Sequence, residues 1–279
     1  MRTQFRTEKK YADCILGLVH TVACTSEKKP DGFKKKLKEN RGVISMFNYF
    51  GGTADGLERK NPLIVGIGDS VTAGHFEYNG VLEELIEKDR QGLLGENDCI
   101  EITDARECYL EKLKDKIIDK YEQTTPSVIN AGIAGDTIIG IQKRLYRDVI
   151  RYQPDLVILN ASLNWGPDCG PKEEYRRIFT EVVASIKEET KSDIVLLTSN
   201  MDLMAEDDMF YNHACTLEDR IQIVREIAGE QDVCLADAYK IWEEYARLGN
   251  PIEALLANGI NHPSITGHEV YAEVLMKLL

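Results

Sequence analysis

A serine follows an apolar run at residues 64–76, which read IVGIGDSVTAGHF. The Ser70 hydroxyl could attack a carbonyl carbon if a base removed its proton. Alternatively, Ser70 could cap the next helix by accepting a backbone N–H bond, as serines at helix starts commonly do. The local stretch favours the capping role, so the nucleophile hypothesis depends on partners elsewhere in the chain.

The glycines around Ser70 suggest two further interpretations, and both fit poorly. The segment lacks the Lys-Ser/Thr ending of a phosphate-binding loop, and Val71 stands where a dinucleotide-binding G-x-G-x-x-G pattern needs its last glycine. Thr72 stands where the G-x-S-x-G elbow of α/β-hydrolases needs glycine. A nucleotide- or phosphate-binding flavodoxin-like protein is therefore a weaker alternative, and a nucleophilic Ser70 must belong to another scaffold.

A histidine near the C-terminus is the candidate base. His262 lies in LLANGINHPSITGHEVYAEVL, residues 255–275, after the last predicted strand and before an amphipathic helix. Its loop could return over the edge of a sheet, although a capping or surface role is the alternative. His75, five residues after Ser70, is the competing base. The remaining histidines lack a comparable context; they are His20, His213 and His268.

Attack on a carbonyl also needs donors for the oxyanion, and losing one donor typically costs about 10²–10³ in rate. NAGIAGDT, residues 130–137, follows a predicted strand, and its glycines let a backbone N–H face a ligand closely. NASLNWG, residues 160–166, follows another strand and offers the side-chain amide of Asn164. Each segment alone is more commonly a simple turn. Together with Ser70 and His262, however, they predict one site.

Short apolar runs rich in β-branched residues alternate with helical patterns along the chain. This alternation predicts βαβ units and a three-layer α/β/α fold around a roughly five-stranded parallel, flavodoxin-like sheet. Ligands of such folds bind at the carboxyl ends of the strands, near which all four segments fall. The predicted strands are 62–67, 127–130, 155–161, 193–199 and 232–238, and the predicted helices are 136–152, 172–191 and 216–230.

The first 60 residues do not continue this alternation. Residues 1–60 are predicted to form a helical extension packed on the main domain, residues 61–279. The basic cluster at 28–41 is interpreted as a solvated helix face, with a phosphate-binding or partner surface as the alternatives. The pattern of residues 46–56, MFNYFGGTADG, predicts the end of a strand or helix followed by a Gly-rich turn.

Composition narrows the class of protein further. A formal net charge of −13 opposes binding to nucleic acid. Seven scattered cysteines without C-x-x-C spacing indicate reduced thiols in a cytoplasmic protein rather than disulfides or a zinc ribbon. No run approaches the length of a transmembrane helix, so stable membrane insertion is not expected. The N-terminus loosely imitates an export signal, which leaves export or lipid anchoring through Cys24 as the alternative.

GDSVTAG, NAGIAGDT, NASLN and NHP, in this order and spacing, resemble the four sequence blocks of the SGNH, or GDSL-type, esterase family over roughly residues 60–279. The resemblance implies that Ser70 is the nucleophile and His262 the base. It also implies an oxyanion hole formed by the backbone N–H groups of Ser70 and Gly135 and the amide of Asn164. GDSVTAGHFE and LLANGINHP further resemble bacterial members described as GDSL-like lipases or acylhydrolases.

Two positions depart from the family pattern. Family members commonly have an aspartate three residues before the histidine; here that residue is Gly259, and Asn258 is the nearest polar candidate for orienting His262. An amide or carbonyl fixes the tautomer without the charge of a carboxylate, so a Ser-His dyad or an atypical triad is expected. In the third block Trp165 replaces an acidic residue, and it could form an apolar wall for an acyl or sugar group.

The sequence thus predicts a serine esterase that works through an acyl-enzyme and needs no metal or cofactor. Short acyl esters of carbohydrates, such as acetyl esters, are the first expected substrates. Lysophospholipid or thioester hydrolysis and a catalytically weakened binding module are the alternatives. The loop 201–215 is interpreted as a packed surface loop, with a role in shaping the pocket as the alternative, and the oligomeric state is left open.

Overall fold

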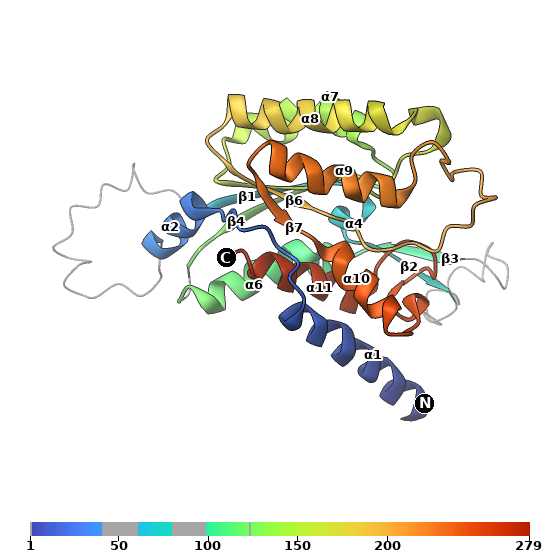
Figure 1. The fold of residues 1–279 in the computed structure, drawn as a ribbon. Coiled ribbons are helices and arrows are strands. Elements are labelled where there is room, and N and C mark those ends of the chain that lie inside the picture. Colours follow the sequence, from blue (N-terminus) through green and yellow to red (C-terminus); the bar gives the residue numbers. More distant parts are fainter. Residues whose placement is uncertain (1, 41–60, 80–98, 123) are drawn as a thin grey trace, which may run out of the picture.

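A five-stranded parallel sheet forms the centre of the computed structural model, which describes residues 2–40, 61–79, 99–122 and 124–279 (Figure 1). The strands lie in the order β4-β1-β5-β6-β7, so β1 pairs with β4 on one side and with β5 on the other. Their bounds are β1 Leu63–Gly68, β4 Ser127–Gly132, β5 Leu156–Asn160, β6 Asp193–Leu197 and β7 Cys234–Ala236.

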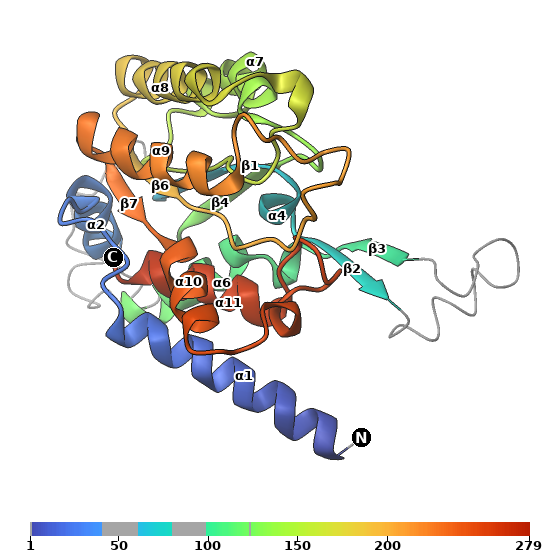
Figure 2. The ribbon, with the colours of Figure 1, turned by 45° about the vertical axis from the view of Figure 1, so that its right-hand side comes forward.

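Helices cover both faces of this sheet (Figures 1 and 2). One face is covered by α7 (Ile138–Asp148), α8 (Lys172–Glu189) and α9 (Leu217–Glu230). The other is covered by α6 (Tyr109–Lys120), α10 (Ala238–Arg247) and α11 (Ile265–Met276). The predicted three-layer α/β/α fold with a five-stranded parallel sheet is therefore confirmed.

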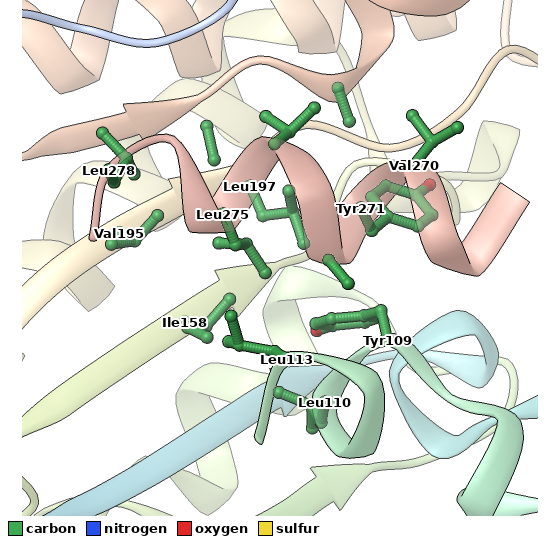
Figure 3. Close-up of a cluster of buried hydrophobic side chains, with 14 of the residues drawn as sticks. Tyr109, Leu110, Leu113, Ile158, Val195, Leu197, Val270, Tyr271, Leu275 and Leu278 are labelled. Carbon is green, nitrogen blue, oxygen red and sulfur yellow. The ribbon is translucent and has the colours of Figure 1, made fainter. Parts of the chain in front are cut away.

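The strands read as continuous apolar runs because both of their faces are buried. Figure 3 shows the core on one side, where Ile158 and Val195 of the sheet face Leu113 of α6 and Leu275 of α11. Val157, the neighbour of Ile158 on β5, belongs instead to the core beneath α7, α8 and α9. This alternation is the two-residue period of a strand, and it anchors the sheet to both helical layers.

Several elements differ from the sequence-based prediction. The helices α6 and α10 were not predicted. The antiparallel pair β2 (His75–Asn79) and β3 (Cys99–Thr103) was not predicted either, and it extends away from the central sheet (Figure 2). The strand predicted at 232–238 covers only Cys234–Ala236, because Asp237 already caps α10 by accepting the N–H of Lys240.

The N-terminal helix α1 (Arg2–Thr21) packs on the layer of α6, α10 and α11. In α1, Ile15 and Val19 are fully buried in the core that includes α10 and α11. The Lys277 ammonium donates to the carbonyls of Val19 and Val22 at 2.6 and 2.8 Å, which satisfies the end of α1. Residues 41–60 lie outside the described residues, so the turn at 46–56 and the domain boundary at 60 stay predictions.

The basic cluster lies on α2 (Asp31–Glu39). This helix buries Phe33 and Leu37 and exposes Lys35 and Lys38, as expected for a solvated helix face. Over the part of the chain that the structure describes, no helix has both the length and the apolar character needed to cross a membrane. Cys24, the alternative anchoring residue, is 1% exposed and follows α1.

Candidate active site

Ser70 is the first residue of the short helix α4 (Ser70–Ala73), directly after β1. Asp69, and not Ser70, caps this helix: its Oδ1 accepts the N–H of Val71 at 2.9 Å. The capping role that the local sequence favoured for Ser70 is therefore wrong. The Ser70 hydroxyl instead lies 2.9 Å from Nε2 of His262.

The pair of Ser70 and His262 is almost fully enclosed, with exposed fractions of 3% and 8%. At 2.9 Å the imidazole nitrogen can accept the hydroxyl proton. The two residues are 192 positions apart in the sequence, so only the tertiary fold brings them together.

The loop before α11 is shaped by Asn258. Its Oδ1 accepts the backbone N–H groups of Ile260, Asn261 and His262 at 3.0, 2.9 and 2.9 Å. Gly259 has a φ of +69°, a left-handed conformation that glycine adopts without steric cost. Asn258 thus acts on the backbone that carries the histidine, and a glycine in place of the family aspartate suits this turn.

The histidine loop is also tied to the loop after β6. The Asn200 amide donates to the carbonyl of Asn261 at 2.9 Å, and the Tyr271 hydroxyl donates to Asn200 Oδ1 at 2.7 Å. The N–H of Leu203 donates to the carbonyl of Ile260 at 2.7 Å. These contacts fix the loop from both sides, which keeps the imidazole in place.

His75, the competing candidate, lies beside the base. Its Nδ1 is 2.9 Å from the Thr103 hydroxyl, and its ring packs edge-to-face against the ring of His262 with centroids 5.4 Å apart. His262 is therefore the histidine that contacts the Ser70 hydroxyl, and His75 packs against the ring of His262.

The expected oxyanion residues come from the loops after β4 and β5. Gly135 has a φ of +72°, so the loop needs a residue that adopts the left-handed region. The Asn164 side-chain amide donates at 3.1 Å to the carbonyl of Asp136, the residue that follows Gly135. The N–H of Ile133 donates to the carbonyl of Gly68 at 3.1 Å, which joins the Gly135 loop to the segment just before Ser70.

Arg144 of α7 ties these segments together, although it is only 7% exposed. Its Nη2 donates to the carbonyl of Gly68 at 2.9 Å and its Nη1 to the carbonyl of Ala131 at 2.6 Å. Its Nε donates to Asp136 at 2.6 Å, and Nη1 also reaches Asp148 at 2.9 Å. One guanidinium thus holds the ends of β1 and β4 and the loop that contains Gly135.

Arg220 of α9 holds the backbone segment just before Asn164. It is 5% exposed, and its Nε and Nη2 donate to the carbonyls of Ser162 and Leu163 at 2.6 and 3.2 Å. Its Nη1 donates to the carbonyl of Cys215 at 2.6 Å. Arg220 therefore joins the loop after β5 to the loop after β6.

Sequence reasoning missed both arginines, although a signal was present. Arg144 stands three residues after the buried Ile141, and Arg220 stands three residues after the buried Leu217. Residues three apart share a helix face, so each arginine lies on the apolar stripe. A charge at such a position needs buried partners, and here those partners are the carbonyls of the site loops.

A cavity of about 510 Å³ adjoins the expected oxyanion residues Gly135 and Asn164. Residues of the loop 201–215 form one wall of this cavity. The loop therefore shapes the pocket, which the sequence left open as the alternative to a packed surface loop. Trp165 forms part of another wall, with its indole N–H donating to the carbonyl of Gly170 at 2.8 Å. The lining also includes Leu163, Asp202, Met204, Glu206, Phe210, Tyr211, Asn212, Glu218, Arg220 and Asn261.

The described ranges contain no group of three or more His, Cys, Asp or Glu side chains placed to hold a metal ion. The six cysteines whose side chains the structure describes are all free.

The chain belongs to the GDSL-like lipase/acylhydrolase family, whose model matches residues 67–270. An acetylxylan esterase from Geobacillus stearothermophilus is 27% identical over 166 residues, which cover 56% of this chain and 74% of that protein. Membership of this family makes the protein a hydrolase of ester bonds, as predicted.

Solved structures share the fold at lower identity. Axe2, an acetylxylan esterase from Geobacillus stearothermophilus, is 21% identical with a TM-score of 0.55, covering 78% of this chain and 93% of that one. LAE5, an α/β hydrolase enzyme from the metagenome of Lake Arreo, is also 21% identical, with a TM-score of 0.56 and coverage of 78% and 94%.

Proposed function

We propose that the protein is a serine esterase in which Ser70 is the nucleophile and His262 the general base. The observation that carries this proposal is the 2.9 Å separation of Ser70 Oγ and His262 Nε2. Ser70 directly follows the central strand β1, so this contact places a base beside a hydroxyl at the edge of the sheet where ligands of such folds bind.

In the first half of the reaction, His262 Nε2 takes the Ser70 proton as Oγ bonds to the carbonyl carbon of the ester. The carbonyl oxygen becomes an oxyanion that accepts N–H bonds from Ser70, Gly135 and Asn164. Asn164 has two amide N–H donors, so the bond to Asp136 leaves one for the oxyanion. The protonated His262 then gives its proton to the alcohol oxygen as the bond from that oxygen to the carbonyl carbon breaks.

In the second half, water replaces the alcohol. His262 removes a proton from water, the resulting hydroxyl attacks the acyl carbon, and the Ser70 ester bond breaks with return of the proton to Oγ. His262 thus serves as base and then acid in each half-reaction. The hydrogen bond from the His262 backbone N–H to Asn258 Oδ1 supports this dual role, because it holds the residue that carries the imidazole through both proton transfers.

We propose acetyl esters of carbohydrates as the substrate class. The support is the 27% identity to a protein described as an acetylxylan esterase, together with a cavity lined by aromatic and polar side chains. Lysophospholipid and thioester hydrolysis remain as alternatives for this site. A panel of acetylated sugars, p-nitrophenyl esters of increasing length, lysophospholipids and acyl thioesters separates the classes by kcat/KM.

Replacement of Ser70 tests the nucleophile. Ser70→Ala should lower kcat for p-nitrophenyl acetate by at least about 10³-fold, because the variant lacks the Oγ on which the proposed acyl-enzyme forms. A fluorophosphonate probe should add its mass to the Ser70 peptide of the wild type and not to this variant. Ser127→Ala, at an exposed position on β4, is the matched control and should keep wild-type activity. A folded Ser70→Ala variant with full turnover would refute the assignment and leave a binding module of the same fold as the better description.

We also propose a cytoplasmic location, as the sequence predicts. The free state of the six described cysteines supports it, since reducing compartments keep thiols unpaired. Fractionation of cells that express the full chain tests the proposal, and recovery in the membrane fraction with lipid on Cys24 would contradict it.

A further inference from the structure

The cavity beside Gly135 and Asn164 is larger than an acetyl group needs. Its volume of about 510 Å³ lies in the range of about 300–1,000 Å³ that is typical of sites for whole small molecules. Its lining reaches from the expected oxyanion residues to Asn261, the neighbour of the base His262. If the acyl group is short, the part of the substrate that fills this space is the alcohol.

Aromatic side chains form much of the apolar wall. Trp165 is held in place by its bond to Gly170 and by an edge-to-face contact with Tyr175, with ring centroids 5.2 Å apart. Phe210, in the loop 201–215, is 63% exposed, and Tyr211 lies next to it. The exposed ring of Phe210 and the half-buried ring of Tyr211 provide surfaces on which the apolar face of a sugar ring can stack.

Acidic side chains form most of the charged lining. Asp202, Glu206 and Glu218 line the cavity, and Arg220 is the cationic side chain that accompanies them. The Nε, Nη1 and Nη2 atoms of Arg220 each donate to a backbone carbonyl, so this buried guanidinium is held by the site loops while keeping its positive charge. Three carboxylates against one guanidinium leave an excess of negative charge in the lining that a bound ligand meets. They accept hydrogen bonds from hydroxyl groups and repel a ligand carboxylate.

We propose that this cavity, the acidic pocket, binds the alcohol part of the substrate as a glycosyl unit without an anionic group, and that its carboxylates exclude sugars bearing a carboxylate. The inference rests on the proposed esterase function and deepens it by naming which sugars the site accepts. Asp202, Glu206 and Glu218 provide the charge selection. Phe210 and Tyr211 provide the stacking surface, and the buried Trp165 supports the wall behind it.

A pair of matched substrates tests the charge selection. Acetylated methyl glucoside and acetylated methyl glucuronoside differ in one group, a hydroxymethyl or a carboxylate, and present the same kind of ester. The wild type should show a kcat/KM at least about tenfold lower for the glucuronoside, because like charges would be brought together in the pocket. The ratio of the two kcat/KM values is the readout, since any effect on the Ser70 chemistry cancels from it.

The double variant Glu206→Gln/Glu218→Gln removes two carboxylates and keeps both side chains nearly the same size. It should reduce the ratio of kcat/KM for the glucoside to kcat/KM for the glucuronoside toward one. The control Glu188→Gln/Glu189→Gln removes two exposed charges on α8, outside the pocket, and should keep the wild-type ratio. Phe210→Ala should raise KM for the acetylated glucoside by about threefold to tenfold through loss of the stacking surface.

Three outcomes would overturn the inference. The first is a wild type that hydrolyses the glucoside and the glucuronoside with equal kcat/KM. The second is a preference for the glucoside that the Glu206→Gln/Glu218→Gln variant retains. The third is turnover of p-nitrophenyl acetate without turnover of either acetylated sugar. Failure of the proposed function is separate, because it would appear as p-nitrophenyl acetate turnover that does not depend on Ser70.

Discussion

Asp69, the residue before the expected nucleophile, is fully buried. Burial raises the pKa of its carboxyl to about 7, and the nearby Asp136 adds to the increase, whereas the backbone N–H bond from Val71 opposes it. In the unfolded chain the pKa of an aspartate is about 3.9. Asp69 therefore binds a proton more strongly in the folded protein, and the free energy of unfolding should fall as the pH rises between these two values.

Replacement of Asp69 by Asn should remove this dependence on pH. An amide oxygen can still accept the N–H of Val71, so the cap is retained while the buried charge is not. Urea unfolding at a series of pH values from 4 to 7.5 should give a smaller loss of stability for Asp69→Asn than for the wild type, by up to a few kcal/mol across this window. Parallel curves for the two proteins would show that the Asp69 carboxyl does not titrate as stated.

His268 contributes a pH dependence of opposite sign, so the comparison between variant and wild type is essential. Burial lowers the pKa of this imidazole to about 3, and its Nδ1 accepts the N–H of Tyr109 at 3.2 Å. The unfolded chain binds that proton near pH 6.5, so the folded state loses stability as the pH falls from there toward 3. Because His268 is present in both proteins, its effect cancels from the difference that isolates Asp69.

At the scale of the elements, two helices place a charge where their apolar stripes face the sheet. α7 contributes Arg144 and α9 contributes Arg220, and both guanidinium groups donate to carbonyls of the loops that carry the expected site residues. A flat guanidinium can serve several acceptors at once, which a lysine ammonium on a flexible stem does less well. The helices therefore position the loops as well as covering the sheet.

Arg144→Lys tests this positioning role. A lysine keeps the positive charge near Asp136 and Asp148, but it cannot bridge the carbonyls of Gly68 and Ala131 in the same geometry. We expect kcat for p-nitrophenyl acetate to fall about tenfold with KM nearly unchanged, since oxyanion stabilisation depends on small displacements of its donors.

The neighbouring Arg147→Lys is the matched control, because Arg147 has an exposed side chain that pairs with Asp148. It should keep the wild-type kcat. A lowered melting temperature for Arg144→Lys without a change in kcat would mean that Arg144 stabilises the fold and does not position the site.

On the scale of the whole molecule, the N-terminal helix α1 shares the core of the layer beneath α10 and α11 (Figure 2). The backbone after it pairs with the sheet, since Thr25 forms an antiparallel bridge with Ala236 and the N–H of Asp237 donates to the carbonyl of Cys24 at 2.7 Å. Because these contacts are continuous with the main core, we expect α1 and the sheet to unfold in one transition.

Two substitutions in α1 should have opposite effects. Ile15→Ala removes a fully buried side chain and should lower the free energy of unfolding by about 2–5 kcal/mol. Gly17→Ala adds a methyl group where nothing lies within 4 Å, and it should raise stability by about 0.5–1 kcal/mol. Chemical denaturation followed by circular dichroism measures both, and an unchanged midpoint for Ile15→Ala would show that α1 is not part of the cooperative unit.

Elements with a strong local pattern were predictable. The strands around Val157 and Val195 are continuous apolar runs, because both faces of the sheet are covered by helices. The helices at 172–191 and 216–230 repeat their apolar residues about every 3.6 positions, so both kinds of pattern fit within a short window. The helix α6 and the pair β2 and β3 were missed. The strand β2 pairs with another short strand outside the central sheet, and its sequence, HFEYN, alternates polar residues with aromatic ones instead of forming a continuous apolar run.

The sequence by itself determined the kinds of residue at the site and the strand ends that carry them: Ser70, Gly135, Asn164 and His262 each follow a strand or lie in the terminal loop, and that placement depends on local periodicity. Only the tertiary structure decided that Asp69 caps α4, that His262 rather than His75 meets the Ser70 hydroxyl, and that buried arginines hold the loops. These outcomes depend on contacts between segments far apart in the chain, such as the 192 positions that separate Ser70 from His262, and no local pattern encodes which side chains meet.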